Sequence, residues 1–334
     1  MALCHLWHAK ICEISLKLHE CRQTREQSGN DKGKYFMTLI NSKSGNLLKE
    51  NLENNVFVYT SELSPERGAD LSKMKGIYEL LKDRVSAFNI TDNQGANMKM
   101  ASLAGSIYIK QAGGEPIFQQ TCRDRNRMAL ESDLLGAAAF GVKNILALTG
   151  DYISFGDHKH AKAVYDIDSV NLIEIVKGLN AGADMNGNKL NGPADFYIGA
   201  AVNPESVPLE PQLVKFEKKI KAGCDFFQTQ AVFDTAKFAE FHDFYKNFKN
   251  IKIIAGIYIL KSSKTARYMN KFIPGIYITE QIINELENAP DPLKKGIEIA
   301  ARTAKELKPL VHGIHIMAYG IEDKIPLFLD EFER

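Results

Sequence analysis

The stretch ALESDLLGAAAFGVKNILALTGD, residues 129–151, contains one complete repeat of helix, strand and polar turn. Leu130, Leu134 and Ala138 lie at helical spacing in its first part. The apolar run at 144–148 then has the length of a short buried strand and ends in the polar turn TGD. This order of elements is typical of proteins in which helices and parallel strands alternate.

The same alternation extends outward from this stretch in both directions. Short apolar or β-branched runs predict eight strands, at 56–59, 85–90, 116–118, 144–148, 196–202, 225–227, 251–257 and 312–317. Segments with helical spacing lie between them, for example at 127–140, 170–179 and 213–222. We therefore expect a single catalytic (β/α)8 TIM barrel over residues 37–334. An open doubly wound sheet is the competing architecture, but neither G-x-G-x-x-G after the first strand nor a P-loop motif occurs.

Two segments depart from the simple repeat. Residues 182–194 are rich in Gly and Asn, which predicts a surface turn or a small hairpin before the fifth strand. Residues 277–307 are too long for one helix and are broken at Pro290 and Pro292, so we expect an additional helix before the last strand.

Composition excludes several classes of protein. The 334 residues include 42 Lys and Arg against 41 Asp and Glu, so no charge excess indicates a nucleic-acid partner. The longest apolar runs are far shorter than the roughly 20 residues that span a bilayer, which argues against a membrane partner. An odd number of cysteines without a signal peptide indicates free thiols and a cytoplasmic protein. They are Cys4, Cys12, Cys21, Cys122 and Cys224.

Residues 1–36 differ from the rest of the chain. Three of the five cysteines, three of the eight histidines and the one tryptophan lie within the first 21 residues, and a polar stretch follows. We interpret this segment as an N-terminal extension, either disordered or not native, with Met37 as an alternative start. A zinc site formed by its Cys and His residues is the competing interpretation, although their spacing matches no closed site.

The residues that follow the apolar runs are unusually polar. In a barrel, the carboxyl ends of the strands converge on one mouth, where ligands bind. Six of these ends carry hydroxyls, amides or carboxyls, at 61–62, 91–94, 119–121, 149–151, 203–205 and 228–230. Turn chemistry alone can explain any one of them. Together they predict a mouth lined by hydrogen-bonding groups, which suits a large neutral heterocycle better than a phosphate or a metal ion.

Two other kinds of chemistry have weaker support. The H-x-H at 158–160 beside Asp157 contains competent metal ligands, but a solvated loop is the favoured explanation and we expect no metal. Cys122 lies near the mouth, and Arg123 and Arg125 could lower its pKa. No partner histidine is evident, so nucleophilic catalysis by this thiol is not favoured.

Several motifs together resemble the methylenetetrahydrofolate reductase family. They are TSELSPERG at 60–68, QQTCRDRNR at 119–127, the stretch 129–151 quoted above, AAVNPES at 200–206 and KKIKAGCDFFQTQAVFD at 218–234. The combination of LTGD with AGCDFFQTQAVFD is the specific part of the match. The similarity runs from about residue 56 to about residue 269, with a looser match through the last strand.

The resemblance implies an enzyme that reduces 5,10-methylenetetrahydrofolate to 5-methyltetrahydrofolate with FAD as cofactor. It also implies a form that consists of the catalytic domain alone, as a homo-oligomer or as a subunit of a reductase complex. The electron donor stays open between NAD(P)H and a ferredoxin or flavoprotein partner. Alternatives are another flavin barrel, such as a proline dehydrogenase-like enzyme, and a folate-binding methyl-transfer protein or non-catalytic subunit.

Site residues follow from the resemblance, motif by motif. Glu62 matches the family's general acid, which protonates N10 when the five-membered ring of the folate opens. Asp151 matches the aspartate between flavin and folate, where a carboxylate stabilises the cationic iminium of the opened substrate. Gln230 matches the glutamine that binds the pterin, and Thr265 is assigned to the substrate as well.

Further positions match the lining of the flavin site, namely Thr91, Asn93, Gln94, Gln119, Thr149, Gly150, Asp151, Tyr165, Asp166 and Asn203. Lys218 and Lys219 match a basic pair at the diphosphate end of FAD, although a solvated helix face explains them too. The chain departs from the family pattern at Gln119, where the family has histidine, and at Asn203, where it has tyrosine. No arginine for the folate tail follows the last predicted strand.

Overall fold

The computed structural model describes residues 45–334 with the exception of residue 274. The predictions for residues 1–36 therefore lie outside the described residues. Eight parallel strands form a closed barrel in the order β1 to β8, with β8 paired to β1. The strands are β1 (Val58–Leu63), β2 (Ala87–Ile90), β3 (Pro116–Thr121), β4 (Asn144–Leu148), β5 (Tyr197–Val202), β6 (Phe226–Ala231), β7 (Lys252–Tyr258) and β8 (Gly313–Met317). The predicted (β/α)8 TIM barrel is confirmed.

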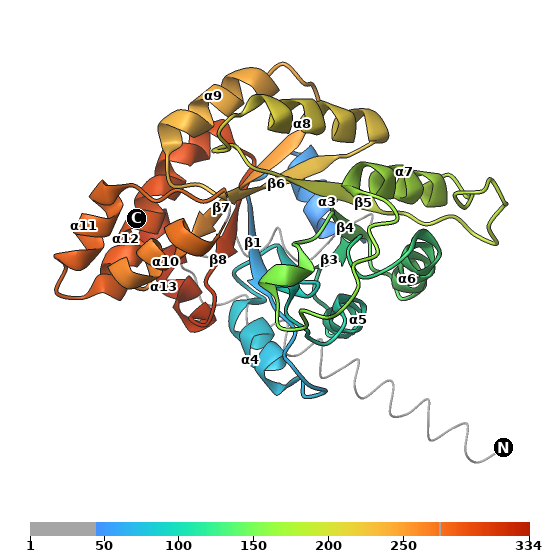
Figure 1. Ribbon diagram of the computed structural model, residues 1–334, viewed down its shortest axis with the longest axis horizontal. Helices are drawn as coiled ribbons and strands as arrows, with labels where there is room; N and C mark the ends of the chain where they lie inside the picture. The colour runs from blue at the N-terminus through green and yellow to red at the C-terminus, as the bar shows by residue number, and fades with distance from the viewer. Residues whose placement is uncertain (1–44, 274) are drawn as a thin grey trace, which may run out of the picture. The chain divides into compact units, whose positions relative to one another are not determined.

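Helices surround the strands (Figure 1). They are α3 (Leu47–Glu53), α4 (Ser72–Leu81), α5 (Ser102–Gln111), α6 (Arg127–Ala139), α7 (Ser169–Asn180), α8 (Glu210–Ala222), α9 (Thr235–Tyr245), α10 (Ser263–Phe272), α11 (Glu280–Glu287), α12 (Pro292–Leu307) and α13 (Ile325–Glu333). Short 3-10 turns lie at η2 (Gln94–Ala96), η3 (Ile153–Phe155), η4 (Lys308–Leu310) and η5 (Glu322–Lys324). No helix within residues 45–273 and 275–334 combines the length and the apolar character needed to cross a bilayer.

Local sequence explains where the helices begin. Asn126 caps α6 by accepting from the backbone of Ala129, and Asp168 caps α7 in the same way. Asp291 caps α12, whose first residue is Pro292, a position where the missing N–H costs no hydrogen bond. The additional helix expected between 277 and 307 is present as α11, and an antiparallel bridge between Ala183 and Lys189 confirms the small hairpin.

Three strands extend three or four residues beyond their predicted ends. The prediction ended the first strand at 59, the third at 118 and the sixth at 227, whereas β1, β3 and β6 each continue into polar residues. The reason is that a strand in a barrel directs alternate side chains inward, so polar residues near the mouth still belong to the ladder. Glu62 and Gln119 are therefore strand residues rather than loop residues.

The barrel interior changes from apolar to polar along its axis. Inward residues near the amino ends of the strands, including Val58, Leu146 and Phe226, pack with Leu48 and Leu52 of α3 in one apolar cluster. The larger core lies between the outward faces of the strands and the surrounding helices. Helix α3 packs at the amino ends of the strands. We therefore expect a ligand at the mouth of the barrel that the carboxyl ends of the strands form.

Candidate active site at the barrel mouth

Glu62 and Asp151 are connected through two consecutive residues of η2. The side-chain amide of Gln94 donates to Oε1 of Glu62 at 3.0 Å, and the backbone N–H of Gly95 donates to Oδ2 of Asp151 at 3.0 Å. Glu62 is half-buried in β1, while Asp151 is exposed in the loop after β4. The structure therefore brings the two carboxyl groups to the same mouth.

The loop that carries Asp151 packs tightly against β3 and η2. Gly150 has φ +95°, and a Cβ there would lie 3.0 Å from Cβ of Arg123 and 3.1 Å from Cβ of Thr121. Further along the loop, the backbone of Gly156 contacts the carbonyl of Ala96 so closely that no side chain would fit. Both glycines allow approaches that a larger residue would prevent, and these approaches fix the position of Asp151.

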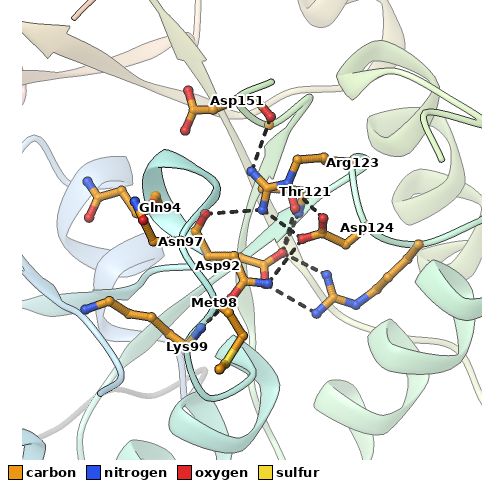
Figure 2. Close-up of polar contacts among 12 residues, drawn as sticks. Asp92, Gln94, Asn97, Met98, Lys99, Thr121, Arg123, Asp124 and Asp151 are labelled. Atoms are coloured by element: carbon orange, nitrogen blue, oxygen red, sulfur yellow. Dashed lines mark hydrogen bonds and ion pairs between the residues drawn. The ribbon is translucent and has the colours of Figure 1, made fainter. Parts of the chain in front are cut away.

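A buried guanidinium holds the loop that carries Asp151. Arg123 is 1% exposed, and it donates to the backbone oxygens of Asn93 at 3.2 Å and Asp151 at 3.4 Å (Figure 2). Its charge is paired with the carboxylate of Asp124 at 2.7 Å. One side chain thereby joins the loops that follow β2, β3 and β4, and holding several backbone groups at once suits the fork geometry of arginine.

A second ion pair fixes the end of β2. Both oxygens of Asp92 accept from Arg125, at 2.9 and 3.3 Å, and Oδ2 also accepts from the backbone and the hydroxyl of Thr121. The Asp92 side chain is fully buried, so these four bonds replace the water that its charge has lost. Sequence reasoning considered the arginines only as neighbours of Cys122 and missed this structural role.

The Cys122 thiol is not activated by its neighbours. Burial raises its pKa to about 12, and the nearby charge of Asp168 adds to the effect. The suggestion that Arg123 and Arg125 could lower this pKa was wrong, because both guanidiniums are engaged by aspartates instead. A thiol with this pKa stays protonated and is a poor nucleophile near neutral pH.

Several predicted flavin residues lie at the mouth with their side chains engaged by the protein. The hydroxyl of Thr91 pairs with Ser64 at 2.8 Å, and the hydroxyl of Thr149 donates to Ser169 at the start of α7. The side chain of Asn93 donates to Asp124 and accepts from the backbone N–H of Lys99. These groups shape the loops around the mouth.

Two further predicted residues hold the loop after β4. Tyr165 donates from its hydroxyl to the backbone oxygen of Asp151 at 2.9 Å. Both oxygens of Asp166 accept from the guanidinium of Arg127, at 2.8 and 2.9 Å, and these bonds lower the pKa of the carboxyl to about 2. Asp166 therefore binds Arg127, the first residue of α6.

The two predicted lysines lie in different environments. Lys218 is exposed on α8, whereas Lys219 is 7% exposed and donates to the carbonyl of Ala201 at 2.5 Å. Burial lowers the pKa of Lys219 to about 8. Lys219 therefore lies beside the end of β5, and Lys218 lies on the solvent side of the same helix.

The remaining predicted residues differ in how much hydrogen-bonding capacity they keep. Asn203 donates to the carbonyl of Gly275, and Thr265 pairs with Ser262 at the beginning of α10. The side-chain amides of Gln119 and Gln230 make no hydrogen bond within residues 45–273 and 275–334. Both residues belong to strands at the mouth, so their donors and acceptors are available to a ligand.

The donor set fits a flavin better than a metal. The free amides of Gln119 and Gln230 supply both donors and acceptors, which the edge of an isoalloxazine requires. Within the described ranges, no three His, Cys, Asp or Glu side chains are grouped so that they could hold a metal ion. Asp157, beside the H-x-H segment, is paired with Arg67 and with the backbone of Met98.

The closed barrel of eight parallel strands, with two carboxyl groups at its mouth, defines the class of the protein as a (β/α)8 TIM-barrel protein. The family model for methylenetetrahydrofolate reductase matches residues 47–332. The chain belongs to the methylenetetrahydrofolate reductase family, as the sequence motifs predicted.

The chain has distant similarity to a yeast protein and to a clostridial protein. Methylenetetrahydrofolate reductase 2 of Schizosaccharomyces pombe is 25% identical over 232 residues, which cover 63% of this chain and 34% of the yeast protein. The chain thus spans about a third of the length of this curated relative. An uncharacterized protein from Clostridium thermocellum, which binds two copies of 5-methyl-5,6,7,8-tetrahydrofolic acid, has a similar structure with a TM-score of 0.62 and 19% identity. That similarity covers 86% of this chain and 99% of the clostridial protein.

Proposed function

We propose that this chain catalyses the flavin-dependent reduction of 5,10-methylenetetrahydrofolate to 5-methyltetrahydrofolate, with FAD at the barrel mouth. The observation that carries the proposal is the link between Glu62 and Asp151 through Gln94 and Gly95, because the reaction needs an acid and a separate anionic group at one site. Membership of the family and the folate ligand of the clostridial protein support the same substrate.

The flavin supplies the redox chemistry, and the protein supplies binding and proton chemistry. Gln119 and Gln230 offer amides for the flavin edge and the pterin, and Gly150 lets the loop after β4 pack closely against Thr121 and Arg123. Lys219 offers an ammonium near the end of β5 for the diphosphate of FAD, if it leaves the carbonyl of Ala201. Lys218 on the outer side of α8 is then a secondary contact.

The two carboxyl groups have different tasks. Glu62 lies in the less exposed position and donates a proton to N10 of the folate as the five-membered ring opens. The carboxylate of Asp151 lies in the exposed loop and stabilises the positive charge that develops on the substrate. Asp151 also keeps the backbone of Gly95 in place, so the charge and the geometry of the site depend on the same side chain.

Reconstitution with FAD tests the proposal. Purified protein is expected to hold the flavin after gel filtration, to show the visible flavin spectrum, and to convert methylenetetrahydrofolate into 5-methyltetrahydrofolate once the flavin is reduced under anaerobic conditions. Mass spectrometry of the folate product shows whether 5-methyltetrahydrofolate has formed. Flavin retention with oxidation of proline would indicate the alternative flavin barrel, and folate binding by a protein that retains no flavin would indicate a methyl-transfer or non-catalytic role. Either result would contradict the proposal.

The electron donor is tested in the same preparation. We propose NAD(P)H or a ferredoxin-type or flavoprotein partner, and each is offered separately to the flavin-loaded protein while the loss of the oxidised flavin spectrum is followed. The donor that reduces the flavin within the turnover time is the physiological candidate. Gel filtration with light scattering of that preparation tests whether the protein forms a homo-oligomer, and co-purification with a second protein would indicate a subunit of a reductase complex.

A further inference from the structure

A row of buried polar side chains crosses the barrel interior directly below Glu62. Asn89 of β2 and Gln228 of β6 exchange two hydrogen bonds, at 2.6 and 3.0 Å. The amide nitrogen of Gln228 also donates to Oγ1 of Thr60 at 3.3 Å, and this oxygen lies 3.0 Å from Nδ1 of His315 on β8. Each of these four residues is at most 4% exposed, so none exchanges its partners readily with water.

The donors and acceptors in this row determine which nitrogen of the His315 imidazole carries the proton. An amide nitrogen only donates, so Oγ1 of Thr60 is the acceptor of the bond from Gln228. Oγ1 of Thr60 carries one proton and two lone pairs, and among the residues that the structure describes it has no hydrogen-bond partner besides Gln228 and His315. The buried hydroxyl proton is therefore paired only if Nδ1 of His315 accepts it, and a buried donor left unpaired is costly. A neutral histidine whose Nδ1 accepts carries its own proton on Nε2. The interior of the barrel therefore selects one tautomer of His315.

The protonated nitrogen faces the proposed acid. Nε2 of His315 lies 3.9 Å from Oε1 of Glu62, which is the same oxygen that accepts from Gln94 at 3.0 Å. At 3.9 Å the N–H acts on Oε1 as an oriented dipole rather than through a full hydrogen bond. With two donors near Oε1, a proton that Glu62 carries is placed on Oε2 rather than on Oε1.

A tyrosine completes the surroundings of the acid. Tyr258 of β7 interacts electrostatically with Glu62, and its pKa is raised by burial first and by the negative charge of Glu62 second. Tyr258 therefore stays neutral near pH 7 and adds no competing charge. Oε2 of Glu62 makes no hydrogen bond with the residues that the structure describes, which leaves it as the oxygen available to a substrate.

We propose that His315 is a positioning residue for Glu62. Its tautomer, selected by Thr60, Gln228 and Asn89, holds Oε1 in the acceptor role and keeps the acidic proton on Oε2, toward the folate. This inference rests on the proposed function for its catalytic consequence. The tautomer itself depends only on the protein and is measured without cofactor or substrate.

Nitrogen NMR of protein labelled with ¹⁵N-histidine tests the tautomer, with the His315 signals assigned by their loss in His315→Gln. We expect the proton on Nε2 in the wild-type protein and in Thr60→Ser, which keeps the hydroxyl. In Thr60→Val, which keeps the shape without the hydroxyl, the preference should disappear. A proton on Nδ1 in the wild-type protein, or a tautomer that Thr60→Val leaves unchanged, would overturn the inference.

Single-turnover kinetics test the catalytic consequence. An asparagine at 315 can imitate Nδ1 but cannot reach Glu62, whereas a glutamine amide can take the place of Nε2. We expect His315→Asn to slow folate reduction by pre-reduced flavin about tenfold, with flavin reduction by the donor retained, and His315→Gln to recover most of the loss. Equal rates in wild-type protein and His315→Asn would overturn the inference. If wild-type protein reduces no folate at all, the proposed function fails, and the NMR result still decides the tautomer.

Discussion

The side-chain amide of Gln94 lies 3.0 Å from Oε1 of Glu62, at the point where the loop after β2 meets the end of β1. Because the next residue, Gly95, binds Asp151, one short 3-10 turn sets the spacing of the two carboxyl groups. A turn held from both sides in this way positions the acid and the anion as a unit. The proposed reaction depends on the spacing that this turn sets.

Asp151→Asn separates the charge of this side chain from its geometry. An asparagine oxygen can still accept from the backbone of Gly95, so we expect little change in thermal stability. The loss of the negative charge should slow folate reduction by about a hundredfold while the flavin remains bound. Stopped-flow measurement of flavin reoxidation by methylenetetrahydrofolate checks the rate, with Asp195→Asn before β5 as the control at the opposite end of the barrel. Equal rates for Asp151→Asn and the control would show that this charge is not used.

Gly150→Ala tests how closely the loop after β4 must approach β3. The residue has φ +95°, and an added Cβ would press on the Cβ atoms of Arg123 and Thr121 at 3.0 and 3.1 Å. We expect the free energy of unfolding to fall by roughly 2 to 4 kcal/mol, measured by urea denaturation. Gly76→Ala is the matched control, because nothing lies within 4 Å of its added Cβ in α4 and a gain of about 0.5 to 1 kcal/mol is expected. Similar changes in both variants would contradict the tight approach.

Glu205 makes stability depend on pH. Burial raises its pKa to about 7, although Oε1 accepts from the backbone N–H groups of Phe233 and Asp234. A carboxyl with a raised pKa binds its proton more tightly in the folded state than in the unfolded chain. Its contribution to stability is therefore complete below pH 4.5 and is lost as the pH rises through about 7, by about 3 kcal/mol at the upper end.

Thermal melts between pH 5 and 8 test this dependence. Glu205→Gln cannot ionise, and its amide oxygen can keep the bonds to Phe233 and Asp234. The melting temperature of the wild-type protein should fall more steeply over this range than that of Glu205→Gln. Parallel curves for the two proteins would mean that Glu205 titrates normally.

The sequence predicted the architecture because the information for it is local. Apolar runs of strand length between helical segments are visible without any knowledge of contacts. The strand ends were placed too early at β1, β3 and β6, since polar residues that face a barrel mouth look like loop residues. Burial, rather than residue type, distinguishes such strand residues from loop residues.

The site was predicted only in part, for a related reason. The motifs identified Glu62 and Asp151 as separate positions, but their connection depends on how three loops pack together. Arg123 reads as an ordinary charged residue, and only the fold shows that it is 1% exposed and joins backbone groups of two other loops. His315 gave a weak signal, as a lone histidine in an apolar strand, and its partners come from three other strands far away in sequence.

Glu62→Gln tests the central claim most directly. The protein is loaded with FAD, reduced without oxygen and mixed with methylenetetrahydrofolate in a stopped-flow instrument, while the return of the oxidised flavin spectrum is followed. Glu79→Gln, an exposed residue of α4, is the control. We predict that Glu62→Gln binds and reduces the flavin normally but reoxidises with the folate at least about a hundredfold more slowly than the wild-type and control proteins. Reoxidation of Glu62→Gln at the wild-type rate, with 5-methyltetrahydrofolate as product, would contradict the assignment of Glu62 as the acid.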